Sequence, residues 1–361
     1  MRNIPLVLTY DDVLILPKRS TLLSRSEAIT KTRLTKKINL NIPIVSANMD
    51  TVSESEMAIA LARLGGISIL HRFMTIEENA EEIKRVKRAQ NFIVADPYTI
   101  DPKKTIREAK KFIAEKGVGG LLVSNGDHKL QGVLSKRDFV FAKDENQLVE
   151  QLMTHREKLV VGGKNTTFVE AREKMSQNKI EKLPLVDEND VIVGLITADD
   201  IKNLTDYPLA NIDASGRLLV GGSVGVHGDF LERAQELVKA GADVLVVDIA
   251  HGHSEMMFNA IKKLREKCGG IQIVAGNIAT AAAARELCEA GVDALKVGVG
   301  PGTICITRLV TGCGVPQLSA VMNVAEAAKQ YGVPVIADGG IQKSGDIVKA
   351  LGAGADTVML G

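Results

Sequence analysis

Short apolar runs rich in β-branched residues alternate along this chain with stretches of helical periodicity, and this alternation limits the possible folds more than any other feature. The runs are apolar at nearly every position, as expected for strands that are buried on both faces. Amphipathic stretches such as residues 230–240 lie between them and would cover a parallel sheet. The sequence therefore predicts an α/β fold, and a (β/α)8 TIM barrel closes this arrangement naturally. The eight predicted strands lie within residues 41–48, 66–71, 218–224, 243–250, 271–277, 294–300, 334–340 and 356–361.

A recurring phrase supports the regular array. It reads KAGADVLVVD at 239–248, EAGVDALKVG at 289–298 and GAGADTVMLG at 352–361. Each copy spans a helix end, a short loop and a strand. We expect Gly241, Gly291 and Gly354 to adopt the left-handed conformation that ends a helix, since it costs little only for a residue without Cβ.

Between the second and third strands lies a segment with its own internal repeat. It matches itself at an offset of 62 residues, in the order helix, strand, turn, strand, helix. We expect residues 1–92 and 213–361 to build the barrel, residues 93–149 the first repeat and residues 153–212 the second. The matched pairs are Thr105 with Thr167, Ala109 with Ala171, Gly132 with Gly194, Ser135 with Thr197, and Asp138 with Asp200.

The repeated segment resembles a tandem pair of CBS repeats, the Bateman module. The ends GVLSKRD and GLITADD match the part of that pattern where a hydroxyl and a carboxylate face a nucleotide ribose. The resemblance makes Asp138 and Asp200 candidate ligands of a regulatory purine nucleotide. The alternative is that both carboxylates cap the helix that follows.

Composition excludes several classes of partner. Lys and Arg number 45 against 44 Asp and Glu, so no excess charge attracts nucleic acid or an anionic membrane. No apolar run approaches the length of a membrane span, and the start does not read as a signal peptide, so we expect a cytoplasmic protein. The four cysteines lack metal or disulfide spacing and are expected to be reduced, with Cys268 and Cys288 packed in helices.

Chemistry in such a barrel is built from the loops that follow the strands. The sixth loop, GVGPGTICITR (298–308), has three glycines in five residues, which permits close backbone approach to a ligand. Cys305 emerges from it, and Arg308 together with exposed amides could lower the thiol pKa and favour the nucleophilic thiolate. The alternative is a packed loop cysteine.

Two further loops carry polar residues. Asp338, Gly339 and Gly340 follow the seventh strand, where barrels bind phosphate, although a tight turn explains them equally. Asp338 is alternatively a hydrogen-bond acceptor for two ribose hydroxyls. Asp248 is a candidate acceptor for a ribose hydroxyl or a carboxamide. His251 and His253 lack a third metal ligand, so a metal site there is not favoured, and a Rossmann fingerprint is missing.

Six motifs resemble the IMP dehydrogenase and GMP reductase family, and the resemblance spans nearly the whole chain. Their combination with the repeated insertion is highly specific. They are LTYDDVLILP (8–17), PIVSANMDTV (43–52), VVDIAHGHS (246–254), GNIATA (276–281), GVGPGTICITRLVTGCGVPQ (298–317) and VIADGGI (335–341).

The resemblance implies that Cys305 attacks C2 of IMP, that hydride passes to NAD, and that the thioimidate is hydrolysed to xanthosine 5′-monophosphate. It also implies a homotetramer and a bound potassium ion. The motifs of the family place Thr307 beside the reacting centre, and they assign potassium to the carbonyls of Gly300, Gly302 and Cys305. The residues that the resemblance assigns to NAD binding are Asp248, Gly298, Val299 and Gly300. Those that it assigns to nucleotide binding are Met49, Asn277, Thr303, Asp338, Gly339, Gly340 and Gly361.

Two departures from the family pattern bear on these expectations. Ile249 stands where relatives often carry a small hydroxyl residue, which removes a possible NAD contact. The sequence ends at Gly361, whereas the family continues into a flap whose arginine activates water. We therefore expect this chain to form the adduct poorly and to hydrolyse it worse. GMP reductase, with NADPH, is the alternative enzyme, and a nucleotide-sensing remnant is the alternative without catalysis.

Overall fold

The structure is a computed structural model that describes residues 5–89, 93–94 and 96–361. It divides into two compact units, Met1–Ala89 with Leu209–Gly361, and Gln90–Pro208. The expected boundary at residue 92 lies outside the described residues. Residues 209–212, which we expected in the second repeat, belong to the barrel unit instead. The reason is a buried hydrogen bond, because Asn211 Nδ2 donates to the carbonyl oxygen of Gly66 at 2.9 Å.

The first unit is a closed barrel of eight parallel strands, which confirms the predicted barrel. The two strands that precede the inserted unit pair with each other and close the barrel against its last and third strands. In order around the barrel the strands are β12 (Gly221–Val224), β13 (Val244–Asp248), β14 (Gln272–Ile278), β15 (Ala294–Val297), β16 (Val335–Asp338), β17 (Thr357–Leu360), β3 (Ile44–Ser46) and β4 (Ile67–Leu70).

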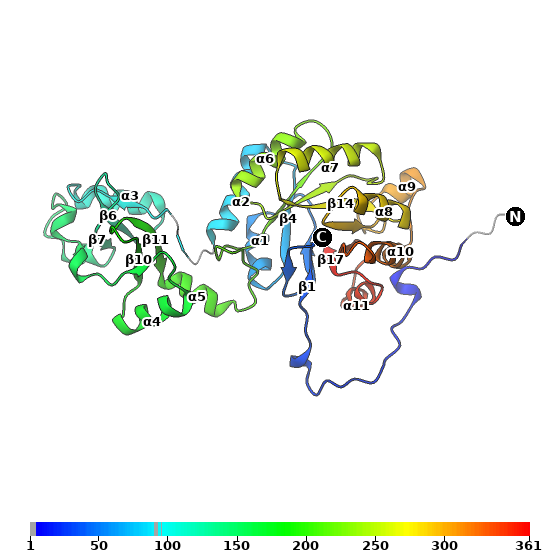
Figure 1. The fold of residues 1–361 in the computed structure, drawn as a ribbon, viewed down its shortest axis with the longest axis horizontal. Coiled ribbons are helices and arrows are strands. Elements are labelled where there is room, and N and C mark those ends of the chain that lie inside the picture. Colours follow the sequence, from blue (N-terminus) through cyan, green and yellow to red (C-terminus); the bar gives the residue numbers. More distant parts are fainter. Residues whose placement is uncertain (1–4, 90–92, 95) are drawn as a thin grey trace. The chain divides into compact units, whose positions relative to one another are not determined.

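Amphipathic helices cover the outside of the barrel, as the periodicity predicts (Figure 1). Their apolar faces bury alanine, leucine and valine side chains against the strands. None of the helices among the described residues is both long and apolar enough to cross a membrane. The covering helices are α1 (Ser55–Arg63), α2 (Ile76–Ala89), α6 (Phe230–Ala240), α7 (Glu255–Lys267), α8 (Ala281–Glu289), α10 (Gln317–Lys329) and α11 (Ser344–Gly352), and the short α9 (Thr307–Thr311) precedes α10.

The barrel interior is packed with apolar side chains and is closed at one end by a hairpin. The hairpin pairs β1 (Thr32–Arg33) with β2 (Asn39–Leu40). Its Leu34 and Leu40 are fully buried in the same cluster as Ile67 and Val244 from the barrel strands. Burying each such side chain contributes about 1.5–3 kcal/mol, so the interior is a core and leaves the polar chemistry to the opposite end.

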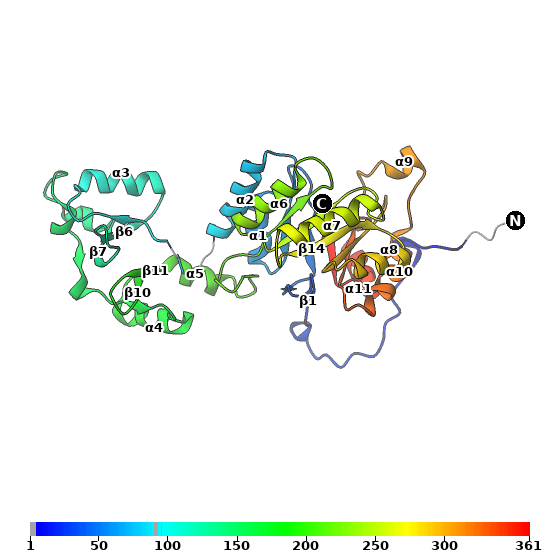
Figure 2. The same ribbon diagram turned by 45° about the horizontal axis from the view of Figure 1, so that its top comes forward.

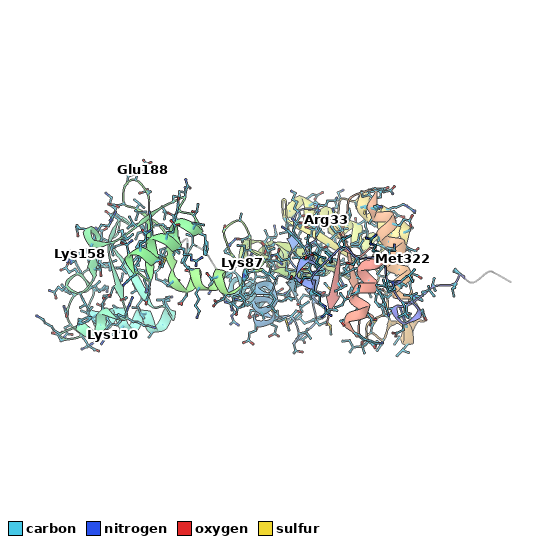
Figure 3. The ribbon with its side chains drawn as sticks, turned by 90° about the horizontal axis from the view of Figure 1, so that it is seen from below. Arg33, Lys87, Lys110, Lys158, Glu188 and Met322 are labelled. Carbon is cyan, nitrogen blue, oxygen red and sulfur yellow. The ribbon has the colours of Figure 1, made fainter. Side chains whose placement is uncertain are left out.

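The recurring phrase has a structural role that its aspartate carries. In each copy this aspartate accepts the backbone N–H at the start of the preceding strand, at 2.8 Å for Asp243 and Asp293 and 2.9 Å for Asp356. Each also pairs with a cation, which is Lys87, Arg265 or Arg33 respectively. Figure 3 labels Lys87 and Arg33. The phrase therefore ties neighbouring strands together.

The glycines of the recurring phrase adopt the predicted conformation. Gly241, Gly291 and Gly354 have φ of 104°, 85° and 107°, which confirms the expected left-handed positions after the helices.

Residues 5–31 lie outside the barrel as an extended stretch that loops away from it before β1, interrupted by the single turns η1 (Tyr10–Asp12) and η2 (Arg25–Glu27) (Figure 2). Two hydrogen bonds of 2.8 Å hold its first part: Leu8 N–H donates to Ser319 Oγ on α10, and Lys349 Nζ on α11 donates to the Tyr10 carbonyl. Tyr10 is buried beside Gly340. The segment around Tyr10 therefore packs against the seventh loop and supports it.

The second unit contains the predicted repeat. Helices, first strands and second strands recur at the offset of 62 residues seen in the sequence. Thr105 and Thr167 begin the two helices with matching capping boxes. The elements are β5 (Thr99–Ile100), α3 (Ile106–Lys116), β6 (Gly120–Ser124), β7 (Leu130–Ser135), η3 (Asp138–Phe141), η4 (Val149–Gln151), β8 (Thr154–His155) and η5 (Arg156–Lys158), then β9 (Gly162–Gly163), α4 (Phe168–Asn178), β10 (Lys182–Val186), β11 (Ile192–Thr197) and α5 (Ala198–Asp206).

Candidate functional site

A buried lysine joins the polar side chains at the carboxyl ends of three strands. Lys296 lies on β15 and is 2% exposed. Its Nζ donates to Asp248 Oδ1 at the end of β13 at 2.9 Å and to Asp338 Oδ2 at the end of β16 at 2.7 Å. It also donates to Asn277 Oδ1 on β14. One ammonium thus holds two carboxylates and an amide in a fixed arrangement.

Asn277 and Asn48 complete this network. Asn277 Nδ2 donates to Asp338 Oδ2 at 2.9 Å and to the Gly298 carbonyl at 2.7 Å. Asn48, after β3, donates to Asp248 Oδ2 at 2.8 Å. Among the described residues, Asp338 Oδ1 has no protein donor, so this oxygen is available to a ligand hydroxyl.

Electrostatics keep the network charged. Burial by itself would lower the pKa of Lys296, but the carboxylates of Asp338 and Asp248 raise it above its usual value. Burial by itself would raise the pKa of Asp248, and the attraction of Lys296 outweighs this and lowers it. The Lys296 ammonium and the Asp248 carboxylate are therefore both ionised at neutral pH.

The candidate nucleophile is partly exposed beside a hydroxyl. Cys305 Sγ lies 3.3 Å from Thr307 Oγ1, and the hydrogen bonds from the Thr307 side chain and backbone lower the pKa of the thiol. Arg308 lowers it further but is a smaller cause than we expected from sequence. Its guanidinium instead donates to the Val315 carbonyl at 2.6 Å. The main cause of the lowered thiol pKa is therefore Thr307, whereas the sequence pointed to Arg308 and exposed amides.

Two cavities open on this face of the barrel. One, of about 550 Å³, is lined by Met49, Thr303, Asp338, Gly339, Gly340 and Gly361 among others. The other, of about 390 Å³, is lined by Met49, Asp248, Asn277, Gly300, Gly302, Cys305, Thr307, Asp338 and Gly339 among others. Because Met49, Gly302, Asp338 and Gly339 line both, a ligand in one would lie against a ligand in the other. The structure thus brings together most of the residues that the sequence singled out.

Glycine is required where the sixth loop passes the seventh. A Cβ on Gly298 would collide with the Asp338 carbonyl, and Gly300, at φ 80°, packs against the Arg308 side chain. Gly339 and Gly340 also have positive φ, of 89° and 78°.

Two residues expected on the cofactor side do not line either cavity. The Gly298 carbonyl accepts from Asn277 Nδ2, and the Val299 carbonyl accepts the Val315 N–H at 3.2 Å. Both residues shape the sixth loop through protein contacts.

Three side chains at the site were missed from the sequence. Lys296 stands inside an apolar strand, and a charged residue in a run buried on both faces was the signal. Asn48 directly follows a strand, which places it at the chemical end of the barrel. Arg72 lines the cavity of Cys305 and helps to lower the pKa of Asp248, and its place after β4 was the corresponding signal.

In the second unit the two aspartates have different surroundings. Asp138 Oδ2 accepts from the Ser135 N–H and hydroxyl at 2.6 and 2.8 Å, and Asp200 Oδ2 from those of Thr197 at 2.8 and 2.6 Å. Both carboxylates therefore close the turn that begins three residues earlier, whereas the alternative interpretation was that they cap the helix that follows. Asp138 in addition lines a cavity of about 240 Å³ with cationic neighbours, whereas Asp200 is not among its lining residues.

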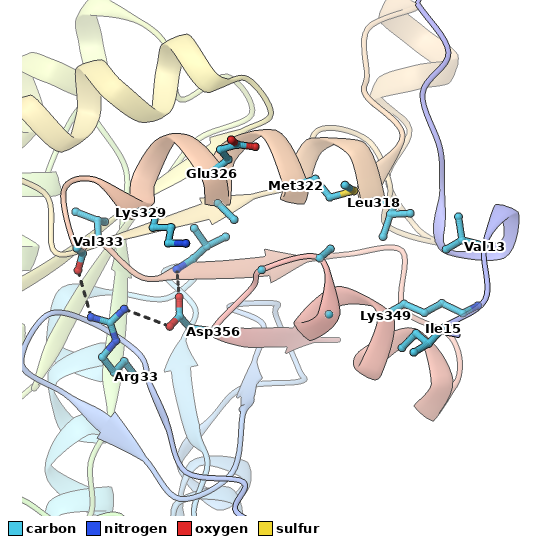
Figure 4. A pocket seen from close by; sticks show the side chains of 16 residues that line it. Val13, Ile15, Arg33, Leu318, Met322, Glu326, Lys329, Val333, Lys349 and Asp356 are labelled. Carbon is cyan, nitrogen blue, oxygen red and sulfur yellow. Dashed lines mark hydrogen bonds and ion pairs between the residues drawn. The ribbon is translucent and has the colours of Figure 1, made fainter. Parts of the chain in front are cut away.

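A larger cavity of about 740 Å³ lies on the outside of the barrel (Figure 4). Val13 and Ile15 of the N-terminal stretch, Met322 of α10 and Lys349 of α11 line it, and Arg33 pairs with Asp356 at its edge. It shares none of its lining residues with the two cavities at the strand ends. We therefore do not assign the chemistry to it.

Comparison with known proteins places these residues in context. Residues 7–361 match the family model described as the IMP dehydrogenase / GMP reductase domain. The chain is 50% identical to inosine-5′-monophosphate dehydrogenase of Nitrosopumilus maritimus, over 98% of this chain and 74% of that protein. It is 51% identical to GMP reductase of Leishmania donovani, over 99% and 75%.

Solved structures agree with the sequence comparison. A variant of GMP reductase from Trypanosoma brucei in complex with guanosine 5′-monophosphate superposes with a TM-score of 0.92 at 50% identity, over 99% of this chain and 76% of that one. GMP reductase from the same organism in complex with guanosine 5′-triphosphate superposes with a TM-score of 0.91 at 50% identity, over 99% and 87%.

The contact between Cys305 and Thr307 predicts a change in thiol reactivity. In a Cys313→Ser background, which removes the exposed second thiol, Thr307→Val removes the hydroxyl that stabilises the thiolate and so raises the Cys305 pKa. The pH at which iodoacetamide reacts half-maximally should move upward, and the rate at pH of about 7 should fall several-fold. Thr311→Val, on the same helix, is the matched control, and an unchanged profile for Thr307→Val would contradict the assignment.

Replacing the buried ammonium should destabilise the barrel in a pH-dependent manner. Lys296→Met leaves two partly buried carboxylates without their cation, although each keeps an asparagine donor, at a cost of about 3 kcal/mol at neutral pH. The native Asp248 pKa is lowered, so the native pair stabilises above the ordinary carboxyl pKa of about 3.9 and loses this stabilisation as pH falls through the lower folded value. In the variant, protonation of Asp248 relieves the charge that has lost its cation.

The difference in unfolding free energy between Lys296→Met and the native chain should therefore narrow as the pH is lowered, as measured by urea denaturation at a series of pH values. Lys262→Met, on the exposed face of α7, should stay within about 0.5 kcal/mol. A difference that stays constant or grows with falling pH would refute the role of Lys296.

Proposed function

The chain belongs to the IMP dehydrogenase / GMP reductase family, and from this premise we propose that it oxidises IMP to xanthosine 5′-monophosphate with NAD, through a covalent bond to Cys305. The observation that carries the proposal is the Cys305 thiol of lowered pKa, which lines a cavity that adjoins a second, glycine-lined one. A thiolate in such a place attacks an electron-poor ring carbon.

The proposed chemistry balances in two steps. The Cys305 thiolate attacks C2 of the purine, and the C2–H bond breaks with its electron pair leaving as hydride, so that C2 stays bound to sulfur as a thioimidate. Water then adds at C2 and the carbon–sulfur bond breaks, which yields xanthosine 5′-monophosphate and the free thiol. Covalent catalysis thereby divides one difficult step into two. Thr307 stabilises the thiolate before attack and after release.

The nucleotide has a suitable place in the first cavity. Backbone N–H groups beside Gly339, Gly340 and Gly361, with the Thr303 hydroxyl, suit a phosphate. The free Oδ1 of Asp338 suits a ribose hydroxyl, since a carboxylate accepts strongly from hydroxyl donors. Met49 would line the base, and Asn277 acts by fixing Asp338 rather than by offering its own amide.

The residues near Cys305 have the chemistry needed to bind NAD and potassium. Asp248, Arg72 and Gly300 line the cavity that contains Cys305, and these charged and backbone groups fit a dinucleotide. When bound, NAD accepts the hydride that C2 loses. The carbonyls of Gly300, Gly302 and Cys305 are neutral oxygens, which fit potassium in chemistry, and we propose that they bind it.

We also propose a homotetramer. Ile304, Ile306, Leu309 and Val310 expose apolar side chains around the sixth loop, which is typical of an interface. Analytical ultracentrifugation distinguishes a tetramer from a monomer.

GMP reductase is the second candidate, in which GMP loses ammonia at C2 and receives hydride from NADPH. The identity of 51% to the Leishmania donovani GMP reductase and the superposition on the Trypanosoma brucei one favour it. Both reactions use the same attack of a thiol on C2, so the geometry at Cys305 is shared.

A direct assay separates the candidates. We expect IMP with NAD to give NADH and a purine adduct on Cys305 in the intact mass. Cys305→Ala should lower the rate by more than about 1000-fold, because the covalent step is lost, and Cys313→Ser should stay active. If the chain instead converts GMP and NADPH to IMP, the assigned function would change from dehydrogenase to reductase. Nucleotide binding to residues 93–212 without any adduct would replace both by a nucleotide sensor.

For the second unit we propose that residues 93–149 and 153–212 are CBS repeats that bind a regulatory purine nucleotide. The repeated elements support this, and so does the cavity at Asp138, where Arg137, Lys158 and Lys182 supply positive charge. A GMP reductase of 50% identity forms a complex with guanosine 5′-triphosphate.

Removal of the two aspartates should affect nucleotide binding unequally. Asp138→Ala should weaken the binding of guanosine 5′-triphosphate at least about tenfold, the loss of one hydrogen bond to a charged group. Asp200→Ala removes an equivalent turn cap but no group lining the cavity, and is the matched control. Isothermal titration calorimetry measures both, and equal losses would assign the carboxylates to capping alone.

A further inference from the structure

His71 is a buried imidazole that neither the proposed chemistry nor the barrel core uses. It follows β4 at the chemical end of the barrel and is 2% exposed. Its carbonyl accepts from Asn79 Nδ2 at 3.2 Å, and Arg233 Nη1 in turn donates to Asn79 Oδ1 at 3.2 Å. Asn79 is fully buried and Arg233 nearly so. The backbone of His71 is thus fixed from behind.

The ring of His71 has a defined orientation. Its Nδ1 accepts the Phe73 N–H at 3.2 Å, so in the neutral ring the hydrogen is on Nε2. Nε2 faces Glu54 Oε1 at 3.5 Å and Asp50 Oδ1 at 3.7 Å. His71 therefore directs an N–H donor toward two carboxylates.

The cluster of Asp50, Glu54 and His71 could alternatively bind a metal ion. The candidate ligand atoms of Asp50, Glu54 and His71 lie within 4.8 Å of one another. A metal-bound histidine usually donates from its second ring nitrogen to a neighbouring acceptor. Here the second nitrogen accepts from Phe73 instead, so metal binding through Nε2 would require that hydrogen bond to break. The tautomer favours a hydrogen-bond role.

The two carboxylates stand on the loop that carries Asn48 and Met49. This loop joins β3 to α1, and Glu54 is the residue that precedes α1. Asn48 binds Asp248 at 2.8 Å, and Met49 lines both cavities. Thr51 has φ of 60°, a conformation that costs a residue with Cβ about 1 kcal/mol or more. Such a loop keeps its shape only where its surroundings hold it.

We propose that His71 is a positioning residue that fixes the loop of residues 47–54 through Asp50 and Glu54, and thereby fixes Asn48 and Met49 at the nucleotide cavity. The carboxylates are 63% and 52% exposed, so solvent screens the contact and the effect on binding is moderate. The proposal rests on the proposed function only in that the cavity binds a purine 5′-monophosphate.

Two readouts test the positioning role separately. Hydrogen exchange of residues 47–54 reports on the loop without any ligand, and calorimetry with IMP and with GMP reports on the cavity. His71→Phe keeps a buried ring but removes the donor, and should speed exchange in this segment and weaken nucleotide binding about fivefold. His71→Gln retains an N–H donor and should recover most of both effects. Should the native chain bind neither nucleotide, the proposed function fails while the exchange data still decide the role of His71.

The exposed partners provide an independent variant that does not disturb the buried ring. Asp50→Ala with Glu54→Ala removes both acceptors and should reproduce the changes of His71→Phe. The three changes together should add little to His71→Phe, because both sets remove the same interaction. Effects that simply add would overturn the proposal, and so would native exchange and binding in His71→Phe. A stoichiometric divalent ion in the native protein that is lost in His71→Phe would overturn it in favour of a metal site.

Discussion

The candidate site depends on one buried ammonium. Lys296 occupies the end of a barrel strand where an apolar side chain would otherwise stand, and its burial is tolerated because Asp248, Asp338 and Asn277 surround it. These partners come from different strands, so the ion pair is also a link between β13, β14 and β16. The orientation of each carboxylate is therefore decided by the barrel rather than by its own loop. A ligand hydroxyl that binds Asp338 or Asp248 would therefore find a carboxylate already held in a fixed orientation.

The thiol is placed by a different means. Cys305 stands on a loop whose close approach to the seventh loop depends on missing side chains, since a Cβ at Gly298 would strike the Asp338 carbonyl. The lowered pKa arises locally from Thr307, two residues away in sequence. The site therefore combines a rigid network of polar side chains around Lys296 with a nucleophile on a glycine-rich loop. The loop after β3 adds Met49 and Asn48, and the Nε2 of buried His71 faces Asp50 and Glu54 of the same loop.

Several elements were predictable because their causes are local. Helix ends at Gly241, Gly291 and Gly354 follow from the steric freedom of glycine. The repeat at an offset of 62 residues was visible because both copies keep their capping threonines. Gly298 and Val299, expected on the cofactor side, line neither cavity at the strand ends, and their carbonyls accept from Asn277 and Val315, because carbonyl direction depends on contacts between loops. Lys296 was overlooked because its partners lie 19 to 48 residues away in the chain.

The sequence by itself determined the barrel of parallel strands, the inserted repeat and, through its motifs, the family, because periodicity, spacing and local sterics are properties of the chain itself. The tertiary structure decided which carboxylate oxygens are occupied, which aspartate of the second unit lines a cavity, and which tautomer the hydrogen bond from Phe73 imposes on His71. The physical reason is that hydrogen bonds and burial depend on distances between residues that are far apart in sequence, and such distances exist only once the barrel has closed.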